Sequence, residues 1–210
     1  MTRGRFISLE GGEGTGKSTQ LRALSRALEQ QGLSVVTTRE PGGSSGAEAI
    51  RKLLLEGDAG FWGARAEALL FAAARSDHVD KVIRPAVERG DWVICDRFHD
   101  SSRAYQGGAS GLGDQDILTL HRIGSENFLP DMTLVLDLPE KDSRSRARAR
   151  DGGEGDRFEQ REDAFHSDVA AAFRKFAAAE PDRIKLIDAI GTESDVTGRL
   201  LTALSSLLKK

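Results

Sequence analysis

The feature that most constrains this chain is the segment Gly-Gly-Glu-Gly-Thr-Gly-Lys-Ser at residues 11–18. It matches the pattern G-x-x-x-x-G-K-[ST], and its context also fits, because an apolar run at 6–9 precedes it and a helical pattern over 17–31 follows. Glycines let backbone N–H groups turn toward phosphate oxygens, and the helix adds its positive end. Lys17 is expected to reach the β- and γ-phosphates, and the Ser18 hydroxyl to bind Mg²⁺. The segment therefore predicts a binding loop for a nucleoside triphosphate.

Short apolar runs alternate with longer amphipathic stretches along the rest of the chain. Further strands are expected at 33–38, 92–95, 132–138 and 184–187, and further helices at 47–55, 64–89 (bent or broken near Pro85), 114–125, 158–179 and 196–208. Strands that alternate with helices indicate an α/β fold, here a five-stranded parallel sheet with helices on both faces. The length of 210 residues suits a single domain over 1–210.

Composition narrows the class of protein. The 30 basic and 33 acidic side chains give a net charge of −3, which argues against a protein that coats nucleic acid. The single cysteine, Cys95, excludes an intramolecular disulfide. No apolar run approaches the roughly 20 residues that a membrane helix needs. We therefore expect a cytoplasmic protein that binds neither nucleic acid nor membrane.

The remaining polar segments indicate a second substrate. The one asparagine, Asn127, precedes Phe128, so the Asn-Lys-x-Asp element of guanine-reading GTPases is absent. The segments 39–43 (Arg-Glu-Pro-Gly-Gly) and 96–98 (Asp-Arg-Phe) follow predicted strands, where ligands bind in open α/β sheets. Phe71 and Arg75 lie four residues apart on a predicted helix and share a face that could stack on a base and bond its edge. A small phosphotransferase with an acceptor site is the favoured interpretation.

Taken together, these segments resemble one family. The series consists of Glu-Gly-Gly-Glu-Gly-Thr-Gly-Lys-Ser-Thr at 10–19, Arg-Glu-Pro-Gly-Gly at 39–43, Leu-Phe-Ala-Ala-Ala-Arg at 70–75, Asp-Arg-Phe at 96–98 and Ala-Tyr-Gln-Gly-Gly at 104–108. In this order and spacing it is similar to the thymidylate kinases. The resemblance implies the P-loop NTPase fold and a Mg²⁺-dependent homodimer. It also implies transfer of the γ-phosphoryl group of ATP to dTMP, which gives dTDP and ADP.

The resemblance also implies roles for individual residues. The nucleotide phosphates are expected on the loop residues Gly11, Gly12, Glu13, Gly14, Thr15, Gly16, Lys17, Ser18 and Thr19. Arg39 and Arg97 match arginines that hold the acceptor phosphate, and Asp96 matches the acid that helps to organise Mg²⁺ with Ser18.

The nucleoside of dTMP is expected to lie on a second set of residues. Phe71 matches the ring that stacks on thymine, Arg75 the residue that reaches O4, and Ser102 a small polar residue near the base. The set for the sugar and its surroundings is Glu13 at the 3′-hydroxyl, Tyr105 crowding the 2′ position, Gln106 and Glu159.

The segment 144–157 admits two interpretations. Four arginines, Arg144, Arg146, Arg148 and Arg150, alternate with small residues before a run rich in glycine. Such a charge run is commonly a solvated loop. Members of the family that carry a small residue at the position of Thr15 place an arginine in a lid, so the resemblance favours a mobile lid here. Beside Lys17 and Arg97, the catalytic candidates are then Arg150 first and Arg146 next.

Two other functions stay open at this stage. The chain could phosphorylate another pyrimidine monophosphate such as dUMP, or it could be a nucleotide-binding regulator that has lost catalysis. Each position expected to act in catalysis carries a suitable residue, which does not favour the regulator. A panel of monophosphates tested with ATP separates the three possibilities.

Overall fold

Five parallel strands form the centre of the molecule. The computed structural model describes residues 3–56, 61–139, 141–143, 145, 161 and 163–208. The strands are β1 (Phe6–Glu10), β2 (Val35–Arg39), β3 (Trp92–Asp96), β4 (Met132–Asp137) and β5 (Ile184–Asp188). Their order is β2-β3-β1-β4-β5, and every neighbouring pair is parallel. The predicted α/β fold is thus found, with the strand that leads into the phosphate loop at its centre.

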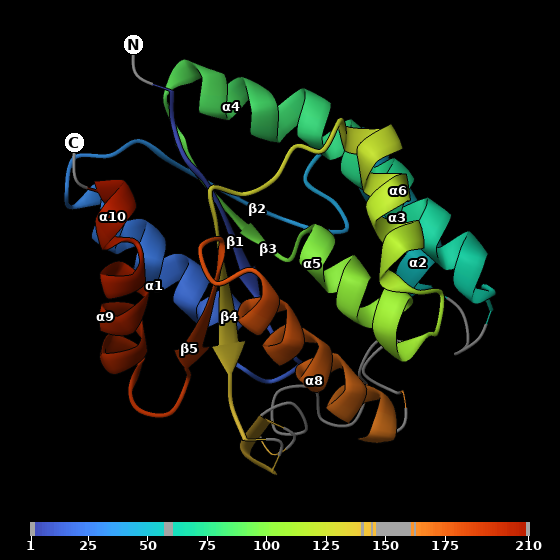
Figure 1. The fold of residues 1–210 in the computed structure, drawn as a ribbon. Helices are drawn as coiled ribbons and strands as arrows, with labels where there is room; N and C mark the ends of the chain where they lie inside the picture. Colours follow the sequence, from blue (N-terminus) through green and yellow to red (C-terminus); the bar gives the residue numbers. More distant parts are fainter. Residues whose placement is uncertain are drawn as a thin grey trace.

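Helices cover both faces of this sheet (Figure 1). One face carries α1 (Lys17–Glu29), α9 (Glu193–Ala203) and the short α10 (Ser205–Leu208). The other face carries α3 (Ala64–His78), α4 (Arg84–Arg89), α6 (Asp114–Ser125) and α8 (Asp163–Ala179), with α2 (Ser45–Leu55) packed beside α3. Coverage on both sides explains why β1 is buried along its whole length.

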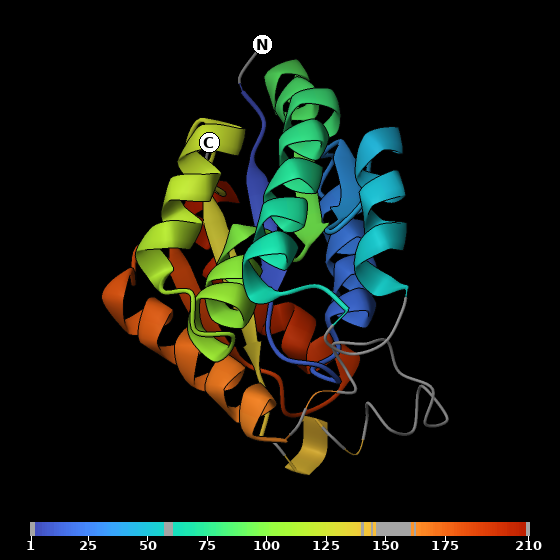
Figure 2. The ribbon, with the colours of Figure 1, turned by 90° about the vertical axis from the view of Figure 1, so that its right-hand side faces the viewer.

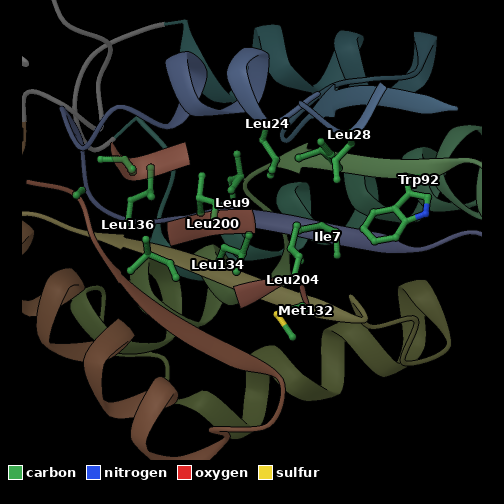
Figure 3. Close-up of a cluster of buried hydrophobic side chains, with 14 of the residues drawn as sticks. Ile7, Leu9, Leu24, Leu28, Trp92, Met132, Leu134, Leu136, Leu200 and Leu204 are labelled. Carbon is green, nitrogen blue, oxygen red and sulfur yellow. The ribbon is translucent and has the colours of Figure 1, made fainter. Parts of the chain in front are cut away.

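Alternate side chains of the strands enter different cores. Ile7 and Leu9 of β1 pack with Leu24 and Leu28 of α1 and with Leu200 of α9 (Figure 3). Phe6 points the other way and packs with Val79, Ile83 and Phe98, meeting the Phe98 ring edge-on at 4.8 Å between centroids. This period of two is the strand geometry that the apolar runs predicted.

The long helical pattern over 64–89 is interrupted, as expected near Pro85. The π-helical segment η1 (Val79–Ile83) separates α3 from α4, so the irregular turn precedes the proline. Figure 2 shows that the three segments together form one long helical ribbon. Pro85 has no N–H, and its ring conflicts with the carbonyl four residues earlier in a regular helix. A wider π turn accommodates both effects.

One buried helical segment was not expected from the sequence. The helix α5 (His99–Ser102) continues into a π-helical stretch, η2 (Arg103–Ala109). Polar contacts hold it: Asp100 accepts bonds from Arg103 Nη1 at 3.0 Å, from Arg183 Nη1 at 2.7 Å and from Thr133 Oγ1 at 2.9 Å. The interactions with His99, Arg183 and Arg103 lower the pKa of Asp100, and they outweigh burial, which alone would raise it. Periodic apolar patterning does not reveal a segment that is anchored in this way.

Several element ends differ from expectation by a few residues. Strand β2 begins at Val35 rather than residue 33, and α9 begins at Glu193 rather than 196, where Thr192 and Asp195 form a capping box. Helix α8 is described from Asp163, so the expected start at 158 lies outside the described residues. Within the described ranges, no helix is long and apolar enough to span a bilayer.

Candidate active site

A pocket of about 780 Å³ lies at the carboxyl edge of the sheet, beside the segments that follow β1, β2, β3 and β5. Parallel strands bring these segments to one edge, which is where α/β folds bind ligands. Most of the residues proposed from the sequence line it: Glu13, Gly14, Thr15, Gly16, Lys17, Ser18, Thr19, Arg39, Phe71, Arg75, Asp96, Arg97, Ser102, Tyr105 and Gln106. Segments far apart in the chain therefore meet in a single cavity.

The phosphate loop joins β1 to α1 and encloses the lysine side chain. Lys17 Nζ donates to the carbonyl oxygens of Gly11 at 3.2 Å and Gly12 at 2.7 Å. Burial, followed by the charge of Arg97, lowers the pKa of Lys17. Gly11 has a φ of 133°, and a Cβ there would lie 2.6 Å from the Leu136 carbonyl oxygen, so this turn requires glycine.

The proposed metal ligands are adjacent. Ser18 Oγ at the start of α1 donates to Asp96 Oδ2 at the end of β3 over 3.1 Å. A hydroxyl and a carboxylate are the oxygen ligands that Mg²⁺ takes, usually completed by substrate phosphates and water. Among the described residues no cluster of three or more His, Cys, Asp or Glu side chains forms a closed metal cage. The pair fits a metal held jointly with a nucleotide.

Arg97 lies between the phosphate loop and the acceptor side of the pocket. Its Nη1 donates to Gly11 O at 3.0 Å, and its Nη2 bonds the carboxylate of Glu13. Tyr105 donates from its hydroxyl to the same Glu13 oxygen at 3.1 Å, and its ring lies 5.0 Å from the guanidinium carbon. Burial lowers the pKa of Arg97, but the charge of the Glu13 carboxylate and of its neighbours outweighs burial, so the pKa of Arg97 is raised overall. The arginine is thus a fixed cation.

Beneath this group, Glu10 holds the turn that carries Arg97. Its carboxyl accepts the Phe98 N–H at 2.8 Å and contacts Ser101 Oγ at 2.5 Å. Ser101 Oγ in turn accepts from Arg97 Nη1 at 3.1 Å. Burial raises the pKa of Glu10 to about 8, and the nearby Asp100 charge adds to this shift. Arg97 itself has a φ of 68°, a left-handed conformation that these contacts support.

The aromatic and guanidinium pair proposed for the base lies on α3. Phe71 and Arg75 both line the pocket, and Arg75 Nη2 donates to Ser102 Oγ at 2.8 Å. Gln106 lines the same wall, with its Nε2 donating to Glu67 at 2.9 Å. Two of the predicted base-proximal residues, Arg75 and Ser102, are therefore in direct contact.

Arg39 occupies a more open part of the rim. Its Nη2 bonds the Glu48 carboxylate of α2 at 3.2 and 3.3 Å, and both side chains are more than one-third exposed. The backbone N–H of Gly43 lowers the pKa of Glu48 most, burial opposes this shift, and the Arg39 charge adds a smaller lowering effect. Exposed pairs of this kind are weak, so Arg39 is able to exchange its partner for an anionic ligand.

Some proposed residues are not placed, and other pocket residues were missed. The lid candidates Arg144, Arg146, Arg148 and Arg150, together with Glu159, lie outside the described residues. Glu40, Pro41 and Phe98, which belong to the segments 39–43 and 96–98 but received no individual role, also line the pocket. So do residues outside the segments named from the sequence: Gln20, Arg22, Arg51, Leu55, Ser101, Ala189, Gly191, Thr192, Glu193 and Val196. The last five follow β5, and their place at the carboxyl edge was the signal that could have found them.

Comparisons with known proteins agree with this geometry. The family model for thymidylate kinase matches residues 9–199. A thymidylate kinase of Rhizorhabdus wittichii is 63% identical over 98% of this chain and 99% of its own, and one of Bradyrhizobium diazoefficiens is 49% identical over 98% and 91%. The crystal structure of a thymidylate kinase from Ehrlichia chaffeensis has a TM-score of 0.79 at 28% identity, covering 96% of this chain and 99% of that one.

One pocket at the edge of the parallel sheet holds both the phosphate loop and further cations, Arg39, Arg75 and Arg97. This combination defines a P-loop phosphotransferase. The extent and identity of the matches make the assignment specific: the chain belongs to the thymidylate kinase family. The family, fold class and enzyme class expected from the sequence are confirmed. Family membership also means ATP-dependent phosphoryl transfer.

The buried carboxyl of Glu10 predicts a stability change with pH. Its pKa is about 8 in the folded protein against 4.5 ordinarily, so folding favours the protonated form. Stability should fall as pH rises between these values, by up to about 1.4 kcal/mol per pH unit. The substitution Glu10→Gln mimics the protonated carboxyl and should remove this slope. Urea denaturation of both proteins between about pH 5 and 9 measures it.

Glu48→Gln provides the matched control. The pKa of this exposed carboxyl is lowered rather than raised, so its contribution changes only in more acidic solution. Its replacement should shift the curve without altering the slope between about pH 5 and 9. Parallel curves for Glu10→Gln and the unaltered protein would contradict the assignment of a raised pKa.

Proposed function

We propose that this pocket transfers the γ-phosphoryl group of ATP to dTMP, giving dTDP and ADP. The observation that carries the proposal is that one cavity is lined both by the phosphate loop and by the acceptor set of Phe71, Arg75 and Arg97. Donor and acceptor phosphates repel each other, so the transfer requires cations on both sides and in-line positioning rather than covalent chemistry. No finding favours dUMP as the acceptor or a silent regulator.

At the donor end, we assign the phosphates of ATP to the loop N–H groups and to Lys17. The support is that Lys17 Nζ already lies within the loop, 2.7 Å from the Gly12 carbonyl oxygen. Mg²⁺, held by Ser18 and Asp96, would neutralise phosphate charge when bound. The lysine then shares the γ-phosphoryl charge as it moves toward the acceptor.

At the acceptor end, we assign the dTMP phosphate to Arg97 and Arg39. Arg97 is fixed beside the phosphate loop, whereas Arg39 lies at the open rim with a weakly held partner. A phosphate monoester has a second pKa near about 6, so it is largely ionised at neutral pH. The attacking oxygen therefore needs no general base, and these residues act by placement and charge.

For the nucleoside, Phe71 stacks on thymine in this proposal and Arg75 bonds O4 with Ser102 beside it. Glu13 faces the 3′-hydroxyl, with Tyr105 crowding the 2′ position and Gln106 on the same wall. The contact between Glu13, Arg97 and Tyr105 supports this role, because a carboxylate within a phosphate-binding loop would otherwise repel the ligand. Glu159 remains proposed near the sugar.

The lid is the second part of the proposal. The chain forms one kinase domain, in which segment 144–157 closes over ATP and excludes water. Thr15 is a neutral loop residue whose hydroxyl donates to Gly12 O at 2.9 Å. The extra cation at the γ-phosphoryl group is therefore assigned to Arg150, with Arg146 as the next candidate.

The active form is a homodimer in this proposal, and its location is the cytoplasm. Helices α2 and α6 both pack against α3, one on each side of it (Figure 2). Each of the three carries an exposed apolar side chain: Leu53 of α2 is 52% exposed, Leu69 of α3 is 57% and Ile123 of α6 is 68%. An apolar surface of this kind is typical of a protein interface. The cytoplasm supplies ATP and keeps thiols such as that of Cys95 reduced.

A monophosphate panel tests the function. With ATP and Mg²⁺, dTMP should exceed dUMP in kcat/KM by about 10- to 200-fold, since a methyl group in a pocket contributes about 1–3 kcal/mol. Ribonucleotide TMP should be poor because Tyr105 crowds a 2′-hydroxyl. Lys17→Ala should remove most turnover while dTMP still protects the protein from heat. Equal kcat/KM for dTMP and CMP would refute the acceptor assignment.

An arginine scan tests the lid. Alanine at position 150 should lower kcat by about 100-fold or more, with less effect on the KM for dTMP, because the contact forms with the moving phosphoryl group. The single replacements Arg144→Ala and Arg148→Ala serve as matched controls, and Arg146→Ala tests the second candidate. If all four variants keep kcat within about threefold, the segment is a solvated loop and the lid proposal fails.

Light scattering of purified variants tests the dimer. Ile123→Asp places a charge in the proposed interface and should give a monomer, because an unpaired buried charge is strongly disfavoured. Leu186→Asp is the control, since Leu186 is 45% exposed but lies on β5 at the edge of the sheet. A monomeric mass for the unaltered protein, or a dimer that survives Ile123→Asp, would count against this interface.

A further inference from the structure

Arg75 is held by a chain of polar side chains that extends away from the pocket. Its Nε donates to Glu40 Oε2 at 2.8 Å, and the other Glu40 oxygen lies 3.1 Å from His78 Nδ1. His78 Nε2 lies 2.7 Å from Thr38 Oγ1. Glu40, Arg75 and His78 are all buried, with His78 wholly inaccessible. This series of hydrogen-bonded side chains therefore begins at Thr38 of β2, includes His78 and Arg75 of α3, and ends at the proposed base site.

The direction of each bond follows from the groups involved. An ionised carboxylate only accepts hydrogen bonds, so the Nδ1–H of His78 donates to Glu40. The Glu40 carboxylate is then held at one oxygen by the imidazole and at the other by Arg75. With Nε bonded to Glu40 and Nη2 to Ser102, the guanidinium plane is fixed at two points. The Arg75 guanidinium carbon also lies 5.2 Å from the centre of the Phe98 ring.

Gly43 fits this arrangement. It has a φ of 88°, and a Cβ at this position would overlap both His78 Nε2 and Thr38 Oγ1. Only a glycine therefore lets the loop after β2 pass so close to the imidazole. The Glu-Pro-Gly-Gly segment thus contributes the carboxylate that holds Arg75 and the space for the histidine that holds this carboxylate.

We propose that Glu40 and His78 are positioning residues for base selection: His78 orients Glu40, Glu40 orients Arg75, and the arrangement sets the preference for an oxygen at position 4 of the pyrimidine. The proposal rests on the proposed role of Arg75 in bonding O4. Thymine presents an acceptor at this position and cytosine a donor. An Arg75 guanidinium held in one orientation donates a hydrogen bond to O4 of thymine. Against cytosine its N–H would face the N4 amino group, and both donors would be left unpaired. A mobile guanidinium could rotate away from the amino group, which would weaken this discrimination.

The experiment compares four variants by the ratio of kcat/KM for dTMP to that for dCMP. An amide nitrogen of asparagine takes the place of Nδ1, whereas that of glutamine takes the place of Nε2. His78→Asn should therefore keep the ratio within about threefold, while His78→Gln and His78→Ala should lower it by about tenfold or more. Arg75→Ala reports the full contribution of the arginine. The losses should appear in the KM for dTMP more than in kcat, because the contact is distant from the transferring phosphoryl group.

The outcomes separate this proposal from the one on which it rests. If Arg75→Ala leaves the ratio unchanged, the base-reading role of Arg75 fails and the positioning role fails with it. If Arg75→Ala lowers the ratio but His78→Gln and His78→Ala do not, the positioning role alone is overturned. A purely structural role for His78 would lower the melting temperature of both amide variants without separating their ratios, and would also overturn the proposal.

Gly43→Ala gives a second route should the His78 variants not fold. The added methyl group displaces the imidazole without removing any polar group. It should lower the dTMP to dCMP ratio by about tenfold. Effects on Arg39 and phosphate binding act alike on both substrates, so the ratio isolates the base. A ratio within about threefold of that of the unaltered protein would overturn the positioning role.

Discussion

The carboxyl of Glu10 joins the two halves of the pocket. It lies at the end of the central strand, immediately before the phosphate loop, and it holds the turn after β3 through Phe98 N and Ser101 Oγ. The phosphate loop and Arg97, the arginine proposed for the acceptor, are thereby built on neighbouring strands, with Leu9 of β1 beside Asp96 of β3. Because phosphoryl transfer depends on placement, this shared support has direct consequences for catalysis.

The three arginines assigned to the acceptor, Arg39, Arg75 and Arg97, are each paired with a carboxylate, but the pairs differ in burial. Arg97 with Glu13 and Arg75 with Glu40 are largely or wholly shielded from solvent, whereas Arg39 with Glu48 is exposed. A buried cation without a partner would be costly, so the carboxylates balance the charge of the arginines and orient them. The exposed pair is weakly held. Among these three arginines, two are rigid and one is able to adapt to an incoming anion.

The sequence predicted the sheet, the phosphate loop and the two arginine-bearing turns, because apolar runs and glycine spacing leave clear local patterns. It did not predict α5 and η2, where buried polar contacts of Asp100 add to a short apolar contact of Ala104 and Tyr105 with α8. Nor did it assign roles to Glu10 or His78, since their partners lie 88 and 38 residues away in the chain. A polar contact between distant residues has no periodic signature.

The short segment after β2 illustrates why a motif can be distinctive without touching a ligand throughout. Arg39 lies at the rim, but Glu40 turns inward to Arg75, and Gly43 gives space to His78. Gly42 is restricted in the same way, because a Cβ there would lie 2.5 Å from Glu48 Oε1, the partner of Arg39. Gly42 thus leaves room for the carboxylate that pairs with Arg39, and Gly43 leaves room for the histidine that contacts Glu40. The segment is distinctive because it positions the carboxylates that hold two arginines, Arg39 and Arg75. In the proposed complex these arginines lie at opposite ends of the acceptor, Arg39 at the phosphate and Arg75 at the base.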